Sequence, residues 1–408
     1  MQCGMQSGRA KTTMRESETP PQTRSDTQAS IVCFAGNDWW VHNPYTEKQW
    51  MRRIAARGHK VLFVNSIGIG LPSLSTPRVF SRVALKLKSY ARWLRKSEGV
   101  WVLTPVVFPM WSVPLVARMN VLLLTMQVRL LLRLLGMTDP VFWGGLPTAA
   151  LLLDRIPHGT SVYYIQDNYL AYYDRMTFSS VVENHETMFR RCDDVICASI
   201  GMHAERSLER PRVHYVPHGV APGFLEAGVA APAQAPAAMK DIPHPIIGYW
   251  GSLEVLQDQD LIARMAETHP EWSLVFVGKP MYDTSRMRQY GNVHFIGYVP
   301  IDDVARYGIH FDVAMIPWVQ NAWVKYSAPV KFREYYALGK PVVSADIVEV
   351  RKALPGARTE STIEDFIRAV EDELARDTEE LRHERRALVA GQSWEWSAGL
   401  VLDVILPA

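Results

Sequence analysis

The sequence has little cysteine. Four cysteines in 408 residues are too few for a disulfide scaffold. Cys192 and Cys197 are separated by four residues, and no second Cys or His pair lies near them in the sequence, so a zinc site is not expected. We therefore expect reduced thiols, as in a cytosolic protein.

Long apolar runs are also missing. The longest uncharged run, residues 99–117, contains Pro105, Pro109 and Pro114, which interrupt a membrane-spanning helix. Residues 1–26 are polar and lack the apolar core of a secretory signal, so we expect a disordered tail. These two features predict a cytoplasmic location.

Several catalytic motifs are absent as well. The sequence shows no paired His or clustered carboxylates of metal-binding type, no phosphate-binding P-loop and no Ser-centred nucleophile elbow. We therefore predict no metal site and no bound cofactor. The same absences argue against P-loop nucleotidases and serine hydrolases.

The sequence does contain an alternation of short apolar runs and helical segments. Apolar runs at residues 31–35 and 60–65 flank a helical segment near 47–57, which is the pattern of a βαβ unit in a parallel sheet. A second series of this kind begins at residue 246. At 48% hydrophobic and 21% charged residues, a chain of this length is expected to fold as two globular domains.

The predicted fold class is α/β, with two doubly wound Rossmann-like domains facing a cleft. An Ala/Pro-rich stretch at residues 227–243 has the composition of a linker. The boundaries predicted are a tail at 1–26, an N-terminal domain at 27–226, the linker, a C-terminal domain at 244–390 and a C-terminal helix at 391–408 that packs back on the N-terminal domain.

The charge is divided unevenly between the two halves. Residues 1–240 hold 27 Lys and Arg against 17 Asp and Glu, whereas residues 241–408 hold 17 against 25. The N-terminal half is therefore basic and the C-terminal half acidic, which suggests that they face different partners.

Two segments of the basic half have the composition of membrane-surface helices. Residues 78–96 carry seven basic and no acidic residues, with apolar residues at helical spacing. Residues 115–137 are strongly apolar but place Arg118, Arg129 and Arg133 on one side of a helix, so they suit an interface better than a span. We predict peripheral contact with an anionic membrane surface; the alternative is two basic helices packed on their own domain. No nucleic-acid-binding motif accompanies the charge.

Residues 326–344 are the most informative stretch. Pro329 marks the start of a helix, and Lys331 and Glu334 then lie three positions apart on one helical face. An ammonium and a carboxylate near a helix start suit a nucleoside diphosphate, the first for phosphate and the second for ribose hydroxyls. An ordinary surface helix before a buried strand is the alternative.

Polar residues and glycines follow several predicted strands, at the sheet edge where ligands bind in open α/β folds. Asp167 could act there as a general base toward an acceptor hydroxyl, or it could cap a turn. Glycine allows a ligand to approach the backbone, although a lone glycine after a strand is usually just a turn. The glycine-containing pairs at such positions are Gly36-Asn37, His218-Gly219 and Gly251-Ser252.

In the segments that contain several of these residues, the chain resembles the GT-B glycosyltransferases of bacterial exopolysaccharide and cell-wall polymer synthesis. The resemblance covers roughly residues 30–360 and is more specific in the second half. The segments that carry it are 163–168, 216–220, 247–252, 270–278, 292–297, 311–317 and 329–343.

The resemblance implies a role for each half. In such enzymes the C-terminal domain binds a nucleotide-sugar donor as co-substrate, the acceptor enters against the N-terminal domain, and no divalent metal is normally needed. Lys331 would then neutralise the diphosphate and Glu334 would accept from the ribose. The remaining candidate positions are Gly251, Ser252, Tyr326 and Pro329 on the donor side, and Gly36, Asn37, His218 and Gly219 on the acceptor side.

One position departs from the family pattern. Many retaining members carry two glutamates eight positions apart, and Glu334 matches the second, but the first is replaced by Tyr326. The stereochemical outcome is therefore open. The chain is similar, more distantly, to the xanthan-pathway glucuronosyltransferase, an inverting, membrane-associated enzyme whose catalytic aspartate follows an equivalent strand. On that likeness Asp167 is the expected base.

The sequence thus predicts an enzyme of surface polysaccharide synthesis at the inner face of the cytoplasmic membrane. It would move a sugar from a nucleoside-diphosphate sugar to a lipid-linked or polysaccharide acceptor. Two alternatives keep the fold: a nucleotide-sugar epimerase, and a non-catalytic scaffold that holds a partner enzyme at the membrane.

Overall fold

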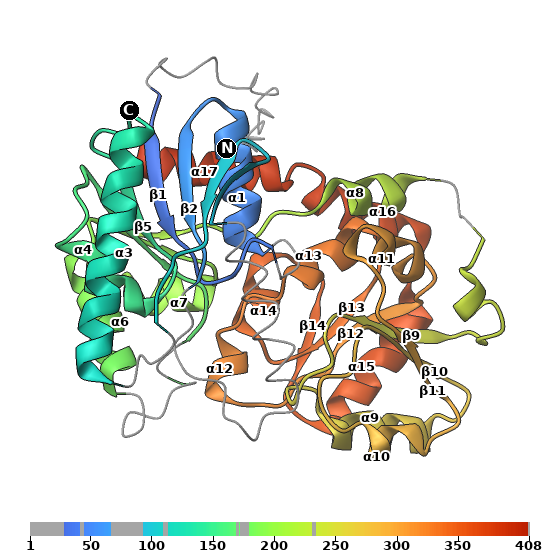
Figure 1. Cartoon of the computed structure of the whole chain (residues 1–408). Helices are drawn as coiled ribbons and strands as arrows, with labels where there is room; N and C mark the ends of the chain where they lie inside the picture. Colours follow the sequence, from blue (N-terminus) through green and yellow to red (C-terminus); the bar gives the residue numbers. More distant parts are fainter. Residues whose placement is uncertain are drawn as a thin grey trace, which may run out of the picture.

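The protein consists of two α/β domains, each built around one sheet (Figure 1). A computed structural model describes residues 28–40, 45–66, 93–108, 113–168, 171, 179–230 and 234–406. The predicted tail at 1–26 lies outside these residues.

The N-terminal sheet has eight strands in the order β3-β4-β2-β1-β5-β6-β7-β8. Neighbouring strands are parallel except for β3 and β4. The strands are β1 (Ser30–Phe34), β2 (Lys60–Val64), β3 (Leu94–Ser97), β4 (Val100–Leu103), β5 (Val141–Gly144), β6 (Ser161–Ile165), β7 (Asp194–Cys197) and β8 (Val213–Tyr215).

Helices cover both faces of this sheet, because successive side chains of each strand point to opposite sides. In β1, Val32 and Phe34 join the core on one face and Ile31 and Cys33 the core on the other. Within the described residues, the helices of this domain are α1 (Thr46–Ala56), α3 (Pro114–Leu134), α4 (Ala150–Leu153), α6 (Ser179–Arg191), α7 (Ile200–Arg206) and α17 (Trp394–Ile405), with a short 3₁₀ turn at Pro147–Ala149.

The helix predicted over residues 78–96 is wrong at its C-terminal end. Most of that segment lies outside the described residues, but Leu94–Ser97 forms β3, antiparallel to β4. The two residues that join the strands, Glu98 and Gly99, have φ values of +50° and +82°. Two consecutive positive φ values make the tight turn typical of a β-hairpin, so local turn geometry overrides the helical spacing.

The C-terminal sheet has six parallel strands in the order β11-β10-β9-β12-β13-β14. They are β9 (Ile246–Trp250), β10 (Ser273–Val277), β11 (Val293–Gly297), β12 (Val313–Ile316), β13 (Val342–Ala345) and β14 (Arg358–Glu360). The helices around them are α8 (Pro222–Val229), α9 (Gln259–Thr268), α10 (Ser285–Arg288), α11 (Ile301–Gly308), α12 (Ala322–Lys325), α13 (Val330–Ala337), α14 (Val348–Ala353), α15 (Ile363–Arg376) and α16 (Glu379–Val389), with a 3₁₀ turn at Ala237–Met239.

The chain passes between the domains twice, and the two crossings pair with each other. The Val220 amide donates to the Gln392 carbonyl at 2.8 Å, and the Trp394 amide donates back to the Val220 carbonyl at 3.3 Å. After the second crossing, α17 lies along α1 of the N-terminal domain, and the Trp50 indole donates to the Ser397 hydroxyl at 2.8 Å (Figure 1). α17 therefore attaches the segment that follows the C-terminal domain to the N-terminal domain.

The first crossing corrects the predicted boundary between domain and linker. α8 continues to Val229, so residues 227–229 are helical. Phe224 of α8 stacks on Trp250 of β9, with ring centres 5.4 Å apart. Since α8 buries its apolar side against the second sheet, the C-terminal unit begins near Val220, before the expected linker.

Candidate functional site

Lys331 lies in the first turn of α13 and reaches over the carboxyl end of β9. Its Nζ donates to the Tyr249 hydroxyl at 3.0 Å and lies 4.5 and 4.8 Å from the ring centres of Tyr249 and Trp318. Aromatic faces attract a cation but do not neutralise it. Among the described residues no carboxylate forms an ion pair with this ammonium, which suits it to an anionic ligand.

The backbone after β9 passes directly beside this ammonium. Gly251 has φ of +127°, and a Cβ at that position would lie 3.1 Å from the Lys331 Nζ. Glycine is favoured by this dihedral, and a side chain here would press on the Lys331 ammonium. The next residue, Ser252, accepts a hydrogen bond from the Tyr249 hydroxyl through its carbonyl at 3.3 Å. The structure thus brings Gly251, Ser252 and Lys331 together.

Glu334 lies one turn further along α13 and is 6% exposed. Its Oε2 accepts a hydrogen bond from the Trp250 indole at 3.1 Å. Burial raises the pKa of Glu334 to about 7, although the Trp250 hydrogen bond and the Lys331 charge act in the opposite direction. One carboxyl oxygen is therefore engaged with the protein.

Trp318 is a member of this group that the sequence did not single out. It follows β12 at the same sheet edge as Gly251, and its indole faces Lys331. Its Nε1 is buried and has no hydrogen-bond partner in the part of the chain that the structure describes. Buried donors are almost always paired, so this indole N–H is a natural partner for a ligand oxygen.

Tyr326 and Pro329 have different places. Pro329 is the N-cap of α13 and sets the start of the helix that carries Lys331. Tyr326 instead donates its hydroxyl to Glu205 of α7, in the N-terminal domain, and its ring packs on Gly201. Tyr326 therefore contributes to the contact between the domains, and its role in donor binding stays a prediction.

Asp167 follows β6 and faces the C-terminal domain. The Trp323 indole donates a hydrogen bond to its carboxylate, and Asn168 Nδ2 lies 3.5 Å from the Ala322 carbonyl. Burial raises the pKa of Asp167 to about 6, and the Trp323 hydrogen bond offsets part of this effect. At neutral pH the group is ionised, yet it accepts a proton more readily than an exposed aspartate does.

Glu47, in the first turn of α1, is a buried carboxylate that the sequence did not predict as a site residue. Its two oxygens accept from the Gly36 amide at 2.7 Å and from the Trp143 indole at 3.0 Å. Burial raises the pKa of Glu47 to about 7 against both hydrogen bonds. Glu47 fixes the loop after β1. An acid at a helix start usually favours the helix dipole, so the sequence alone gave no other signal.

Asn37 lines a small hollow beside this loop. The hollow holds about 200 Å³ of empty space, and Tyr45 and Glu47 also line it. Tyr45 lies close enough to Glu254 of the C-terminal domain for the carboxylate to raise its pKa, in addition to the larger effect of burial. Tyr45, on the rim of this hollow, therefore lies near the segment that follows Ser252.

His218 and Gly219, predicted to lie on the acceptor side of the cleft, pack against other segments of the chain. His218 is buried, its Nδ1 lies 3.0 Å from the Thr46 hydroxyl, and it is hydrogen bonded to the Ala328 backbone. A Cβ on Gly219 would come within 2.4 Å of the Trp394 backbone. This glycine permits close approach of the C-terminal segment.

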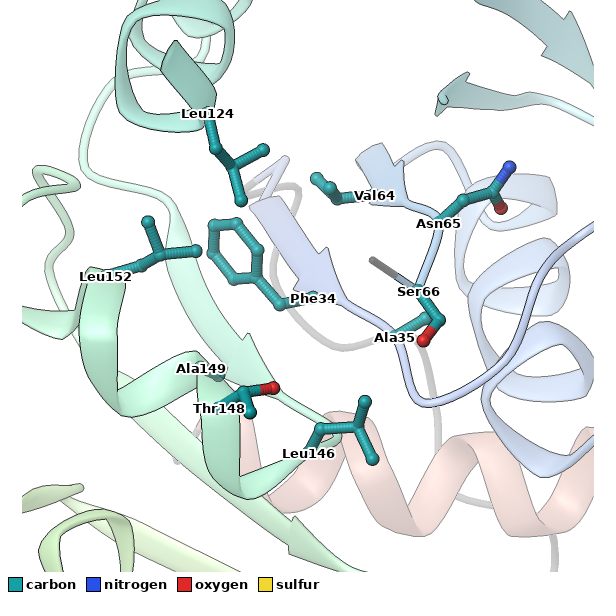
Figure 2. Close-up of a pocket in the computed structure, with 10 residues that line it drawn as sticks. All are labelled: Phe34, Ala35, Val64, Asn65, Ser66, Leu124, Leu146, Thr148, Ala149 and Leu152. Carbon is teal, nitrogen blue, oxygen red and sulfur yellow. The ribbon is translucent and has the colours of Figure 1, made fainter. Parts of the chain in front are cut away.

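A second hollow lies between α3 and the carboxyl ends of β1 and β2. Figure 2 shows Phe34, Leu124 and Leu152 converging on it, with Asn65 and Ser66 on its opposite side. It holds about 300 Å³ of empty space and is lined mainly by apolar side chains. Since Ala35 also lines it, the hollow adjoins the Gly36 loop.

Known families match part of the chain in sequence. Residues 244–381 match the family model described as Glycosyl transferases group 1. A putative teichuronic acid biosynthesis glycosyltransferase of Bacillus subtilis, TuaH, is 26% identical over 221 residues, which is 51% of this chain and 55% of the relative. The chain thus aligns with about half the length of this curated relative.

Solved structures of the same architecture cover nearly the whole chain. HepE of Anabaena in complex with UDP-glucose matches 93% of this chain and 99% of its own, with a TM-score of 0.64 and 11% identity. Sucrose-phosphate synthase of Thermosynechococcus elongatus matches 93% and 98%, with a TM-score of 0.67 and 14% identity. The fold is GT-B, and the predicted fold class and family resemblance are confirmed.

Proposed function

We propose that this protein is a glycosyltransferase that moves a sugar from a nucleoside-diphosphate sugar to a hydroxyl of a lipid-linked or polysaccharide acceptor. The observation that carries the proposal is the Lys331 ammonium. It is held beside Gly251 at the end of β9 without a carboxylate partner among the described residues, inside the domain that matches the glycosyl transferases group 1 family. An anionic diphosphate fits this position by charge.

The donor would be bound by groups already in place. Lys331 would neutralise the diphosphate as it leaves, which is where negative charge grows during the reaction. Gly251 leaves room for a ligand beside the backbone, and the unpaired Trp318 indole N–H would supply a further donor. The remaining oxygen of Glu334 would accept from a ribose hydroxyl. No step here requires a metal ion, and the only co-substrate is the nucleotide sugar.

The acceptor would meet Asp167 from the N-terminal side. Its hydroxyl proton passes to the Asp167 carboxylate, its oxygen forms the new bond to the anomeric carbon, and the bond from that carbon to the diphosphate breaks. The pKa of about 6 suits this proton transfer near neutral pH. Because Trp323 donates to the same carboxylate, the acceptor hydroxyl would displace or share that hydrogen bond.

The class of acceptor and the location are proposed from likeness. The Bacillus relative is named for teichuronic acid biosynthesis, which supports a surface-polymer intermediate as acceptor. Such an intermediate would be built at the inner face of the cytoplasmic membrane. HepE is described in complex with UDP-glucose, so uridine diphosphate sugars are the first donors to test.

A thermal-shift series with UDP-, GDP- and dTDP-sugars tests donor binding, since a ligand of the folded state raises its melting temperature. We expect Lys331→Met to weaken binding of the preferred donor by roughly tenfold to a hundredfold, as the loss of a charged hydrogen bond predicts. Lys352→Met, at an exposed lysine of α14, is the matched control and should bind as the parent does.

Transfer is then measured separately with the same proteins. Asp167→Asn should keep donor binding and lose transfer to a lipid-linked acceptor. Interconversion of two nucleotide sugars without an acceptor would instead identify an epimerase, and donor binding without hydrolysis or transfer would identify a scaffold. Unchanged donor binding in Lys331→Met would refute the site itself.

A further inference from the structure

The outward side of α3 is apolar along its whole length. Six of its Leu and Met side chains are between 43 and 71% exposed. They are Leu115, Met119, Leu122, Met126, Leu130 and Leu134. Their spacing of three or four residues places them on one side of the helix, which is here named the α3 outer face. Exposed apolar side chains grouped this way usually mark an interaction surface.

Two polar side chains of α3 bind the backbone of a neighbouring segment, whose apolar side chains add to this surface. Asn120 forms a pair of hydrogen bonds with the Phe108 backbone, at 2.7 and 2.8 Å, and Gln127 forms a similar pair with the Val106 backbone, both at 3.0 Å. These bonds hold an extended segment along the helix. Its Val106 and Phe108 side chains are 53 and 48% exposed, so the apolar surface is broader than one helix.

The opposite side of α3 is part of the domain core. Val121, Leu124, Val128 and Leu131 are buried against the N-terminal sheet. By length and composition alone, α3 could cross a membrane, a test that core helices of soluble proteins also pass. A helix with one side fixed to its own domain presents only the other side to a partner.

Positive charge accompanies the α3 outer face. Arg118, Arg129 and Arg133 are all exposed, and the helix contains no acidic residue. Arginine extends its guanidinium from an apolar surface into the headgroup layer. Apolar residues beside arginines match the chemistry of an anionic bilayer, with acyl chains below and phosphates above.

We propose that the α3 outer face, with Val106 and Phe108, docks on an anionic lipid bilayer. Figure 1 shows α3 along the outer edge of the N-terminal domain, on the side away from the C-terminal domain. The inner side of α3 lines the hollow of Figure 2 through Leu124, and Ala35 in that hollow precedes the Gly36 loop. Docking would thus place this hollow, which adjoins the Gly36 loop, directly behind the membrane-bound helix.

The docking proposal stands on the chemistry of this face; its link to the acceptor rests on the proposed function. Flotation of the full-length protein with vesicles measures docking without any donor or acceptor. We expect flotation with phosphatidylglycerol-containing vesicles, little with pure phosphatidylcholine, and a decrease as salt is added. The variant Leu122→Gln/Met126→Gln/Leu130→Gln should bind these vesicles at least about tenfold more weakly. Glutamine is a good helix former, so α3 itself should persist.

Control variants use exposed residues outside the α3 outer face. Leu208→Gln, at a leucine that is 87% exposed on another part of the domain, should float as the parent does. Arg129→Gln/Arg133→Gln should bind roughly fivefold more weakly for each arginine removed, whereas Arg264→Gln on α9 should have no effect.

Three results would overturn the proposal. One is flotation of the triple variant equal to that of the parent. Another is a concentration-dependent dimer in sedimentation experiments that the triple variant abolishes, which would identify a second copy of the chain as the partner. Resistance of membrane-bound protein to extraction by alkaline carbonate would indicate a span. Unimpaired donor binding in the triple variant keeps these outcomes separate from a failure of the proposed transferase activity.

Discussion

Three carboxyl groups near the facing edges of the two sheets have raised pKa values. They are Asp167, at about 6, and Glu47 and Glu334, both at about 7. In each case burial is the largest cause, and hydrogen bonds from backbone or indole N–H groups act against it. Strongly shifted carboxyl groups gathered in one region are typical of a functional site, although structural groups can be shifted as well.

Glu47 makes stability depend on pH in a predictable direction. Its folded pKa of about 7 lies above its ordinary value of 4.5, so the folded state binds more protons between these values. The stability that the protonated group contributes is complete below pH 4.5 and is lost as the pH rises through 7. The corresponding decrease in the free energy of unfolding is about 3 kcal/mol.

We therefore expect Glu47→Gln to flatten the pH dependence of the unfolding free energy. Urea unfolding from pH 5 to 8 should show the variant gaining stability relative to the parent as the pH rises. Glu226→Gln, at an exposed glutamate of α8, should follow the parent at every pH. Parallel curves for Glu47→Gln and the parent would show that Glu47 does not titrate in this range.

Sequence reasoning found some members of the donor group and missed others. Lys331 and Glu334 were predicted from their spacing, and the structure brings them to adjacent residues of β9, Tyr249 and Trp250. Trp318 lies at the end of a predicted strand and could have been found by position. Glu47 could not, since its burial depends on the Gly36 loop and Trp143 closing over it.

At the scale of elements, the second crossing between domains depends on close backbone packing. Residues near Val220 and Gln392 hydrogen bond to each other, and α17 then packs on α1. Gly219 lies where the two segments approach most closely. A side chain there would push the crossing segments apart and loosen the attachment of α17.

We expect Gly219→Ala to destabilise the protein by roughly 1–3 kcal/mol or more, since overpacking at a backbone contact forces the chain to move. Gly223→Ala is the matched control: Gly223 is in α8, and nothing lies within 4 Å of the position that an added methyl group would take. There, alanine should be neutral or stabilise by up to about 1 kcal/mol. Chemical unfolding of both variants measures the difference, and equal stability of the two would contradict the packing argument.

At the scale of the whole molecule, a buried polar network joins the domains. Arg333 of α13 forms an ion pair with Glu349 of α14 at 2.8 Å, and both side chains are almost fully buried. Tyr215 of β8 donates to Glu349 at 2.6 Å, and the Ile200 amide donates to its other oxygen at 2.8 Å. The C-terminal ion pair is therefore completed by groups of the N-terminal domain.

Removing one partner of this pair should cost more than removing both. Glu349→Leu leaves a buried guanidinium without its carboxylate, and we expect a loss of about 3–5 kcal/mol in unfolding free energy. Arg333→Met/Glu349→Leu should recover most of that loss because no buried charge is left unpaired. Urea unfolding of the single and double variants measures both unfolding free energies. A double variant as unstable as the single one would contradict this account.

The sequence by itself determined the two sheets, most of their strands and the Lys331–Glu334 helix, because alternating apolar runs and helix-start signals are local in the chain. It did not predict β3. The tertiary structure decided which polar residues serve the cleft and which serve the contact between domains. Tyr326, His218 and Gly219 pack against segments that are distant in sequence. The Trp318 indole lies beside the Lys331 ammonium. Burial and pairing depend on segments far apart in sequence, so only the folded chain fixes them.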